Sequence, residues 1–183
     1  MAICSTDAHD KAYFDSFKPH PYSHPFWLAF FDEIARQIYR WCGPQYAMDI
    51  GCAFGYLVER LRARGIEAWG VDTSEYALSQ ATIRVRPFLR LASGADPLPR
   101  RYDLITCIEV AEHMPENEAL TMIENMCTHT DCVLFSSTPD DHETETHINV
   151  QPAEYWIQAF AAHGMRSAKP ASFLTAHALW FKR

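Results

Sequence analysis

The sequence predicts an α/β fold in which helices cover both faces of a mainly parallel sheet. Short apolar runs of strand length alternate with segments that have helical spacing. The run AMDIGCAFG, Ala47–Gly55, is typical of a buried strand that leads into a glycine turn. The run WGVDTS, Trp69–Ser74, indicates a second strand that also ends in an acid. Strand, turn, helix and strand in this order are the unit from which parallel sheets are built.

The remaining elements follow from periodicity and from the residues that end helices. Apolar residues between Phe26 and Trp41 recur at helical spacing and predict an amphipathic helix. Thr73 or Ser74 can cap the helix that follows the second strand. In chain order we expect strands at 46–50, 68–71, 88–91, 102–108 and 132–137, helices at 56–64, after 74, at 116–126 and at 152–163, and closing strands at 167–169 and 176–181.

Length and composition indicate one domain. The chain has 183 residues, of which 48% are hydrophobic, enough for a proper core. Residues 25–183 are expected to form the domain. Residues 1–24, rich in proline, histidine and aromatic residues without a period, are expected to form a flexible or capping arm. No apolar run reaches the length of a membrane span, and no secretory signal is recognisable. Six cysteines without a CxxC pair fit a reducing cytoplasm.

The distribution of charge argues against a nucleic-acid partner. The net charge is −7, and residues 102–165 contain no lysine or arginine but twelve acids and five histidines. This part of the chain would repel a polyanion. The arginines between Arg84 and Arg101 are expected to form a solvated edge, with a site for a phosphate-bearing substrate as the alternative.

Two carboxylates indicate the ligand. Asp49 and Asp72 are expected at the carboxyl ends of adjacent parallel strands, where open α/β sheets bind ligands. They suit a ligand with an ammonium group and a ribose diol, whereas Asp49 would oppose a pyrophosphate. S-adenosyl-L-methionine is the ligand that these groups indicate. A dinucleotide-binding domain is the alternative, because it also has a glycine after one strand and an acid after the next.

With DIGCAFG, GVDTS and YDLITCIEVAEHM (Tyr102–Met114) in this order, the chain resembles the class I S-adenosylmethionine-dependent methyltransferases. The resemblance implies a Rossmann-like sheet of seven strands with the last strand antiparallel. Ala53 stands where the family usually has its second glycine; its methyl group is tolerable if φ stays negative, so we expect slightly tighter cofactor packing rather than lost binding. The resemblance also assigns cofactor contacts to Asp49, Gly51, Ala53, Gly55, Asp72, Thr73, Asp96 and Ile108.

Acids and histidines after two neighbouring strands suggest a metal site. Glu109, Glu112 and His113 form an E-x-x-E-H segment, and His142 and His147 lie in the polar loop after the next strand. Carboxylates with imidazoles suit Mg²⁺ or another divalent ion. The segment is similar to those of small-RNA terminal 2′-O-methyltransferases and ubiquinone-pathway O-methyltransferases. That likeness assigns metal binding to Glu109, Glu112, His113 and His147. The alternative is that Glu112 and His113 only cap a helix.

These observations together predict a methyltransferase that acts on a hydroxyl of a small molecule or sugar. His142 and His147 are the candidate catalytic histidines, and His142 is the candidate base if no metal takes part. Three alternatives stay open: a metal-independent N- or O-methyltransferase, an RNA-terminal 2′-O-methyltransferase, and a cofactor-binding protein without turnover. The sequence leaves the acceptor and the oligomeric state undetermined.

Overall fold

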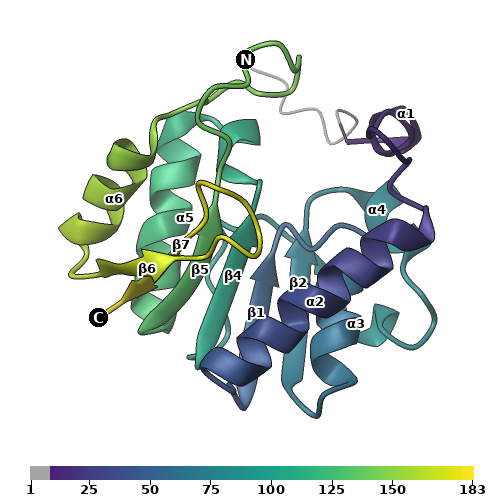
Figure 1. Ribbon diagram of the computed structural model, residues 1–183, viewed down its shortest axis with the longest axis horizontal. Helices are drawn as coiled ribbons and strands as arrows, with labels where there is room; N and C mark the ends of the chain where they lie inside the picture. The colour runs from purple at the N-terminus through teal and green to yellow at the C-terminus, as the bar shows by residue number, and fades with distance from the viewer. Residues whose placement is uncertain (1–8) are drawn as a thin grey trace.

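The computed structural model describes residues 9–183 and contains one seven-stranded sheet. Its strands are β1 (Tyr46–Ile50), β2 (Glu67–Asp72), β3 (Leu89–Leu91), β4 (Leu104–Ile108), β5 (Cys132–Ser136), β6 (Arg166–Pro170) and β7 (Leu179–Lys182). They lie in the order β3-β2-β1-β4-β5-β7-β6, as Figure 1 shows for the central strands. Strands β1 to β5 pair in parallel, and β7 runs antiparallel to both β5 and β6. The predicted fold class is confirmed.

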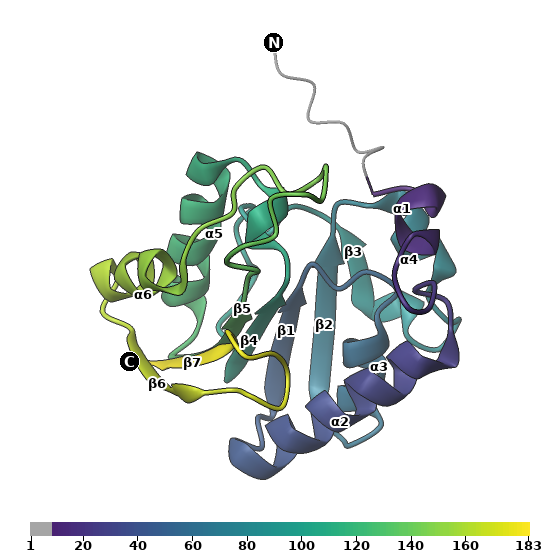
Figure 2. The same ribbon diagram turned by 45° about the horizontal axis from the view of Figure 1, so that its top comes forward.

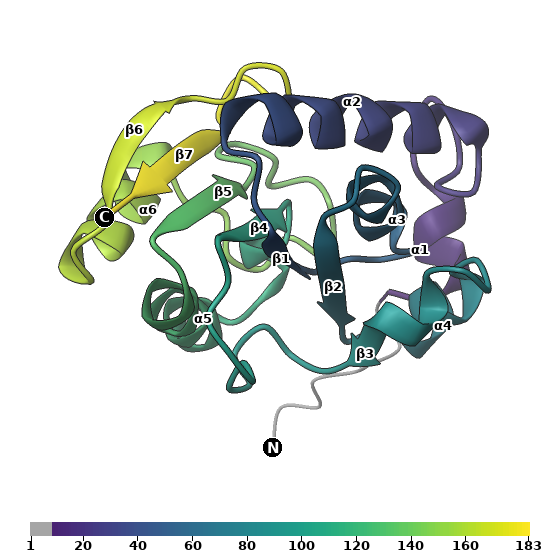
Figure 3. The same cartoon turned by 90° about the horizontal axis from the view of Figure 1, so that it is seen from below.

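Helices cover both faces of this sheet. They are α1 (Lys11–Asp15), α2 (Pro25–Trp41), α3 (Tyr56–Arg62), α4 (Glu75–Gln80), α5 (Glu116–His129) and α6 (Ala153–Ala162), with short 3₁₀ turns η1 (Arg86–Phe88) and η2 (Ala111–His113). Helices α2 and α3 pack on one face, and α5 and α6 pack on the other (Figures 1 and 3). Each face has its own apolar core, and the largest fully buried side chains include Trp156 and Trp180.

Local sequence explains where the helices begin. Pro25 is the first residue of α2, where its missing N–H costs nothing, and the His24 side chain accepts a hydrogen bond from the Phe26 amide. The Ser74 hydroxyl accepts a hydrogen bond from the Ala77 amide at 3.0 Å and so caps α4, as predicted. The α5 helix extends to His129, three residues beyond the predicted end. The fourth strand begins at Leu104 rather than Tyr102.

The carboxyl ends of β1, β2, β4 and β5 share one edge of the sheet. Two long segments lie over this edge: the loop that follows β5, and the N-terminal segment with α1 (Figure 2). The polar residues singled out in the sequence follow β1, β2, β4 and β5, so the fold gathers them on this side of the molecule.

The described part of the predicted arm, residues 9–24, is folded against the domain. It contains α1, which is too short for a periodic pattern to reveal in the sequence. Phe14 and Tyr22 are buried, 5% and 7% exposed, in an aromatic cluster with Phe54. Residues 1–8 of the arm lie outside the described residues. Among residues 9–183, no helix has the length and apolar character that crossing a bilayer requires.

Candidate active site

The turn after β1 packs directly against the segment after β4. Gly51 has φ +72°, and its N–H donates to the Val71 carbonyl at 2.9 Å. A Cβ atom on Gly51 would lie 2.2 Å from Cγ2 of Val110. Glycine is therefore required both by the left-handed backbone and by the close approach of Val110. This contact brings the glycine turn next to the E-x-x-E-H segment.

Ala53 corrects one expectation from the sequence. Its φ is +46°, in the left-handed region, so the expected negative φ is wrong. This conformation costs a residue with a Cβ atom about 1–2 kcal/mol. The Ala53 amide donates to Oδ2 of Asp72 at 2.7 Å, a hydrogen bond to a carboxylate that can offset this cost. The second acid thus holds the turn that follows the first strand.

The two predicted carboxylates lie in different environments. Asp49 is only 5% exposed, and its Oδ1 accepts the Thr106 hydroxyl at 2.6 Å. Burial raises the pKa of Asp49 to about 7, against the opposing effect of that hydrogen bond. Asp72 accepts the amides of Ala53 and Ser74, and burial raises its pKa as well. Since a carboxylate has about four acceptor positions, Asp72 keeps capacity for a ligand's hydroxyls.

A cavity of about 510 Å³ lies beside the end of β2. It is lined by His9, Asp10, Thr73, Glu75, Tyr76, Leu91, Ala92 and Ser93. Its volume is in the range of small-molecule sites. Thr73, one of the residues predicted to contact the cofactor, lines this cavity.

Two other predicted cofactor residues are placed differently. Asp96 is exposed, and its Oδ2 accepts the Ser93 amide at 2.9 Å within the same surface turn. Ile108 packs against the core beneath α2 and α3. Of the eight residues predicted to contact the cofactor, Thr73 alone is among those that line the 510 Å³ cavity.

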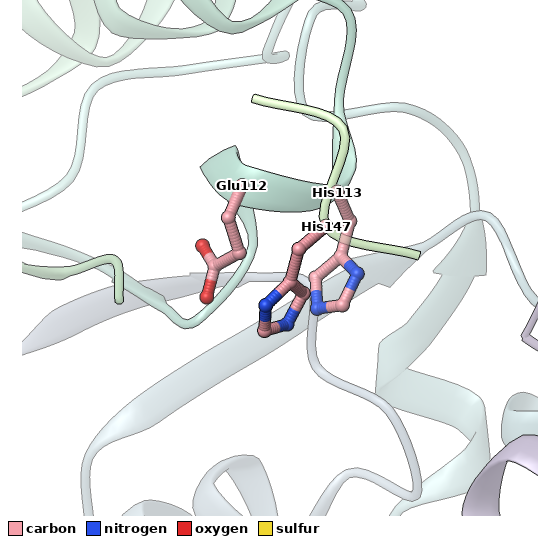
Figure 4. Close-up of side chains that lie close together, drawn as sticks. All are labelled: Glu112, His113 and His147. Atoms are coloured by element: carbon pink, nitrogen blue, oxygen red, sulfur yellow. The ribbon is translucent and has the colours of Figure 1, made fainter. Parts of the chain in front are cut away.

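Three predicted metal ligands converge at the carboxyl edge. Glu112 and His113 come from η2, and His147 comes from the loop after β5 (Figure 4). One potential ligand atom from each residue lies within 4.8 Å of the other two.

The Glu112 side chain is fully buried, and its Oε1 accepts the Thr138 amide at 3.4 Å. No hydrogen bond of normal geometry reaches its Oε2 from the described residues, although Glu109 and Ser137 lie near enough to the carboxyl group to influence its pKa. A buried carboxylate oxygen without a partner is costly and points to a ligand or a proton.

Backbone carbonyls fix the orientation of both imidazoles. Nδ1 of His113 lies 3.2 Å from the Thr146 carbonyl, and Nδ1 of His147 lies 3.0 Å from the Asp141 carbonyl. Because a carbonyl only accepts, both Nδ1 atoms donate, which leaves a lone pair on each Nε2. Burial, with His9 and His147 nearby, lowers the pKa of His113 to about 3. His113 is therefore neutral at physiological pH, as a metal ligand has to be.

Glu109 and His142, also predicted to act here, lie outside this group of three. Glu109 has φ +53°, and its Oε1 lies 3.0 Å from Nε2 of His177. Glu109 nevertheless affects the site: burial, with the charge of Glu109 second, raises the pKa of Glu112 to about 8. His142 is exposed on the loop after β5.

The sequence reasoning missed three contributors to this edge. His177 lies in the loop between β6 and β7, and His9 and Tyr13 lie in the N-terminal segment. The Tyr13 hydroxyl lies 3.4 Å from Nε2 of His113, and the ring centroids of His9 and His113 are 5.0 Å apart. The sequence placed His177 inside the expected closing strand at 176–181, whereas β7 begins at Leu179, so His177 lies in the loop that reaches the carboxyl edge.

Comparisons with known proteins identify the family and the fold. The chain matches the family model for a methyltransferase domain over residues 31–170. It is 32% identical over 108 residues to a ubiquinone biosynthesis O-methyltransferase of Nitrosomonas europaea, covering 55% of this chain and 44% of that protein. The chain spans about half the length of the curated relatives that it matches.

Solved structures show the same fold. Magnesium protoporphyrin IX methyltransferase from Synechocystis, with bound S-adenosylhomocysteine, has a TM-score of 0.70 at 18% identity, covering 85% of this chain and 83% of that one. A sugar N-methyltransferase from Streptoalloteichus has a TM-score of 0.65 at 14% identity, covering 85% and 86%. The chain thus belongs to the methyltransferase domain family and has the fold of the class I S-adenosylmethionine-dependent enzymes.

Proposed function

We propose that this chain transfers the methyl group of S-adenosylmethionine to a hydroxyl of a small molecule or sugar, with a divalent ion held by Glu112, His113 and His147. The observation that carries the proposal is the fully buried Glu112 carboxylate, with Oε2 unpartnered among the described residues, beside the imidazoles of His113 and His147. This group lies next to the glycine turn, through Val110. The names of the curated relatives support oxygen as the methyl acceptor.

The side chains near the carboxyl ends of β1 and β2 suit S-adenosylmethionine. The carboxylate of Asp72 has free acceptor positions for the two ribose hydroxyls, and the adjoining cavity has room for the adenine. Asp49, once ionised, offers the charge that an ammonium group requires. The turn at Gly51 lies between these two acids, so the methionine part of the cofactor would run along it.

The three-residue set suits some divalent ions better than others. One carboxylate and two imidazoles form a mixed oxygen and nitrogen set, which favours Mn²⁺, Fe²⁺ or Zn²⁺ over Mg²⁺. Nδ1 of each histidine donates a hydrogen bond to a backbone carbonyl. Hydrogen bonds of this kind orient imidazoles that bind a metal ion. When bound, such an ion supplies positive charge that lowers the pKa of a hydroxyl group nearby.

A metal-independent methyltransferase is the second candidate. The raised pKa of Glu112, about 8, means that a proton can satisfy its buried carboxylate at neutral pH. Glu112 would then act as a neutral hydrogen-bond donor in the acceptor pocket. The two candidates differ in one measurable property, the response of methyl transfer to a chelator.

The test combines cofactor binding, metal binding and turnover. Calorimetry measures the affinity of the protein for S-adenosylhomocysteine. Formation of S-adenosylhomocysteine from S-adenosylmethionine reports methyl transfer to a panel of catechols, sugar diols, single alcohols and amines. We expect transfer to vicinal diols that is lost in EDTA and restored by Mn²⁺.

Variants separate the roles of the residues. Glu112→Gln is expected to lose Mn²⁺ binding while keeping cofactor affinity, whereas Glu124→Gln, on the exposed side of α5, keeps both. Turnover that persists in EDTA would support the metal-independent candidate. Absence of cofactor binding in the wild type would overturn the proposal altogether.

A further inference from the structure

Glu109 and His177 form a second acid and imidazole pair at the carboxyl edge. Oε1 of Glu109 lies 3.0 Å from Nε2 of His177. Neither side chain is fully buried: His177 is 23% exposed and Glu109 is 35% exposed. Glu109 holds its side chain here from a left-handed backbone, φ +53°, a conformation that is strained for a residue with a Cβ atom. Residues in such conformations are concentrated at functional sites.

Glu109 lies near both the cofactor turn and the group of three. Glu109 follows β4 directly, and its neighbour Val110 fills the space that a Cβ on Gly51 would need. On the other side, the charge of Glu109 reaches Glu112, whose pKa it helps to raise. His177 reaches Glu109 from the loop before β7, whose first residue pairs with Phe135 near the end of β5. An acceptor bound beside the methionine end of the cofactor would therefore meet this pair.

The hydrogen bond determines which nitrogen of His177 is available. A carboxylate accepts, so Nε2 of His177 is the donor in the pair. Nδ1 then carries the lone pair of the neutral ring, and it has no hydrogen-bond partner among the described residues. Since the side chain is part-exposed, a ligand can approach Nδ1. Orientation of an imidazole by a carboxylate is the arrangement in which histidine acts as a general base.

The hairpin does not depend on this bond for its position. Ala171, Leu174 and Ala178 of the same loop are buried in the core beneath α2. Backbone hydrogen bonds within the loop, from Ala171 to the Ala178 carbonyl at 2.7 Å and from Leu174 to the Ala171 carbonyl at 2.8 Å, fix its shape. These other contacts fix the loop, so the hydrogen bond from His177 is not needed to hold it in place.

We propose that His177 is the general base of methyl transfer and that Glu109 orients it; this inference rests on the proposed function. Nδ1 of His177 takes the proton of the acceptor hydroxyl as the oxygen forms its bond to the methyl carbon. The bond between that carbon and the sulfonium sulfur breaks, and its electron pair stays on sulfur. The products are a methyl ether, S-adenosylhomocysteine and an imidazolium that the Glu109 carboxylate stabilises.

The first test needs no acceptor. Long-range ¹H–¹⁵N NMR of the histidine-labelled protein, assigned with His177→Ala, reports which ring nitrogen carries the proton. We expect the proton of neutral His177 on Nε2, and loss of this preference in Glu109→Ala. A proton on Nδ1 in the wild type would overturn the inference, whatever the enzyme's activity.

The second test measures turnover with the vicinal diols of the panel. His177→Ala is expected to lower kcat by about 10²–10⁴-fold, the usual contribution of a general base, with S-adenosylhomocysteine affinity and KM little changed. Added imidazole is expected to restore part of the lost rate, which a structural role would not allow. The matched control is His163→Ala, at the end of α6, which keeps the wild-type rate.

The outcomes separate this inference from the proposed function. Wild-type kcat in His177→Ala would overturn the role of His177 while leaving methyl transfer intact. A loss of kcat that imidazole does not restore, together with a lower melting temperature, would assign His177 to structure instead. A wild-type protein that binds the cofactor and methylates nothing on the panel contradicts the proposed function, and the base role of His177 falls with it, whatever tautomer the NMR experiment reports.

Discussion

The hydroxyl of Tyr13 lies 3.4 Å from Nε2 of His113, so the N-terminal segment contacts the group of three directly. Nδ1 of His113 donates to the Thr146 carbonyl, which means that Nε2 accepts the tyrosine proton. This lone pair on Nε2 is the one that the proposed metal ion would use. Tyr13 and the ion therefore compete for a single atom, and metal binding is coupled to the position of residues 9–24.

Removal of the Tyr13 hydroxyl should strengthen metal binding. A hydrogen bond of this kind contributes about 0.5–1.5 kcal/mol, so Tyr13→Phe is expected to raise Mn²⁺ affinity by about two- to twelvefold. Electron paramagnetic resonance titration of free Mn²⁺ measures the change. Tyr56→Phe is the control, because it removes a hydroxyl that donates to the Tyr22 carbonyl in the neighbouring aromatic cluster. Equal Mn²⁺ affinities in wild type and Tyr13→Phe would show that His113 does not bind the ion through Nε2.

Asp72 is expected to support cofactor binding in two ways. Its carboxylate holds the glycine turn through the Ala53 amide, and it retains acceptor positions for the ribose. Asp72→Ala should weaken S-adenosylhomocysteine binding by about 1.5–3 kcal/mol, the range for lost charged hydrogen bonds. Calorimetry measures this loss.

Asp103 provides a matched control for that substitution. It also accepts two backbone amides, those of Gln45 and Tyr46 at 2.9 and 2.8 Å, but it lies at the opposite end of β1. Asp103→Ala should lower the free energy of unfolding without changing cofactor affinity. If both variants bind the cofactor like the wild type, the cavity beside β2 is not the ribose site.

Much of the fold was predictable because its signals are local. The turn around Gly51, the acids that end β1 and β2, and the cap at Ser74 each depend on a few neighbouring residues. The five-residue helix α1 could not be predicted, because it is shorter than two turns and is stabilised by contacts such as Phe14 with Phe54. Such tertiary contacts leave no periodic pattern in the sequence.

The candidate site was predictable only in part, for the same reason. Glu112, His113 and His147 follow neighbouring parallel strands, and parallel strands bring such residues to one edge. The partner of Glu109 could not be deduced, because His177 comes from a hairpin 68 residues away in sequence. The left-handed φ of Ala53 was also missed, because an alanine in a glycine-rich loop has no signal of its own.

The buried carboxylate of Glu112 should make stability depend on pH. Its pKa is about 8 in the folded protein against an ordinary value of 4.5, mainly because of burial. As the pH rises through this window, the unfolded chain releases the proton first, so the free energy of unfolding falls. Urea denaturation in EDTA measures the free energy of unfolding at each pH. Between pH 5 and 8 this free energy should fall by at least about 2 kcal/mol more in the wild type than in Glu112→Gln.

Two further measurements test that explanation. Mn²⁺ should restore the stability of the wild type at pH 8 but not that of Glu112→Gln, because a ligand that binds only the folded state stabilises it. Glu124→Gln changes an exposed glutamate on α5 and should follow the wild type at every pH. Parallel pH profiles for the wild type and Glu112→Gln would mean that Glu112 keeps its charge, with a partner, in the folded protein.

The contact between Gly51 and Val110 should make the turn after β1 intolerant of any side chain. Gly51→Ala combines left-handed strain of about 1–2 kcal/mol with overpacking against Val110 of about 1–3 kcal/mol. Gly65→Ala isolates the first contribution, because Gly65 has φ +81° and a Cβ atom added there would have nothing within 4 Å. Urea denaturation should therefore show that Gly51→Ala lowers the free energy of unfolding by about 1–3 kcal/mol more than Gly65→Ala does.

Because Val110 adjoins Glu109, Gly51→Ala should also abolish the preference of the His177 ring proton for Nε2, whereas Gly65→Ala should keep it. Equal losses of stability in the two variants would mean that Val110 moves aside freely and that the turn and the E-x-x-E-H segment are not coupled.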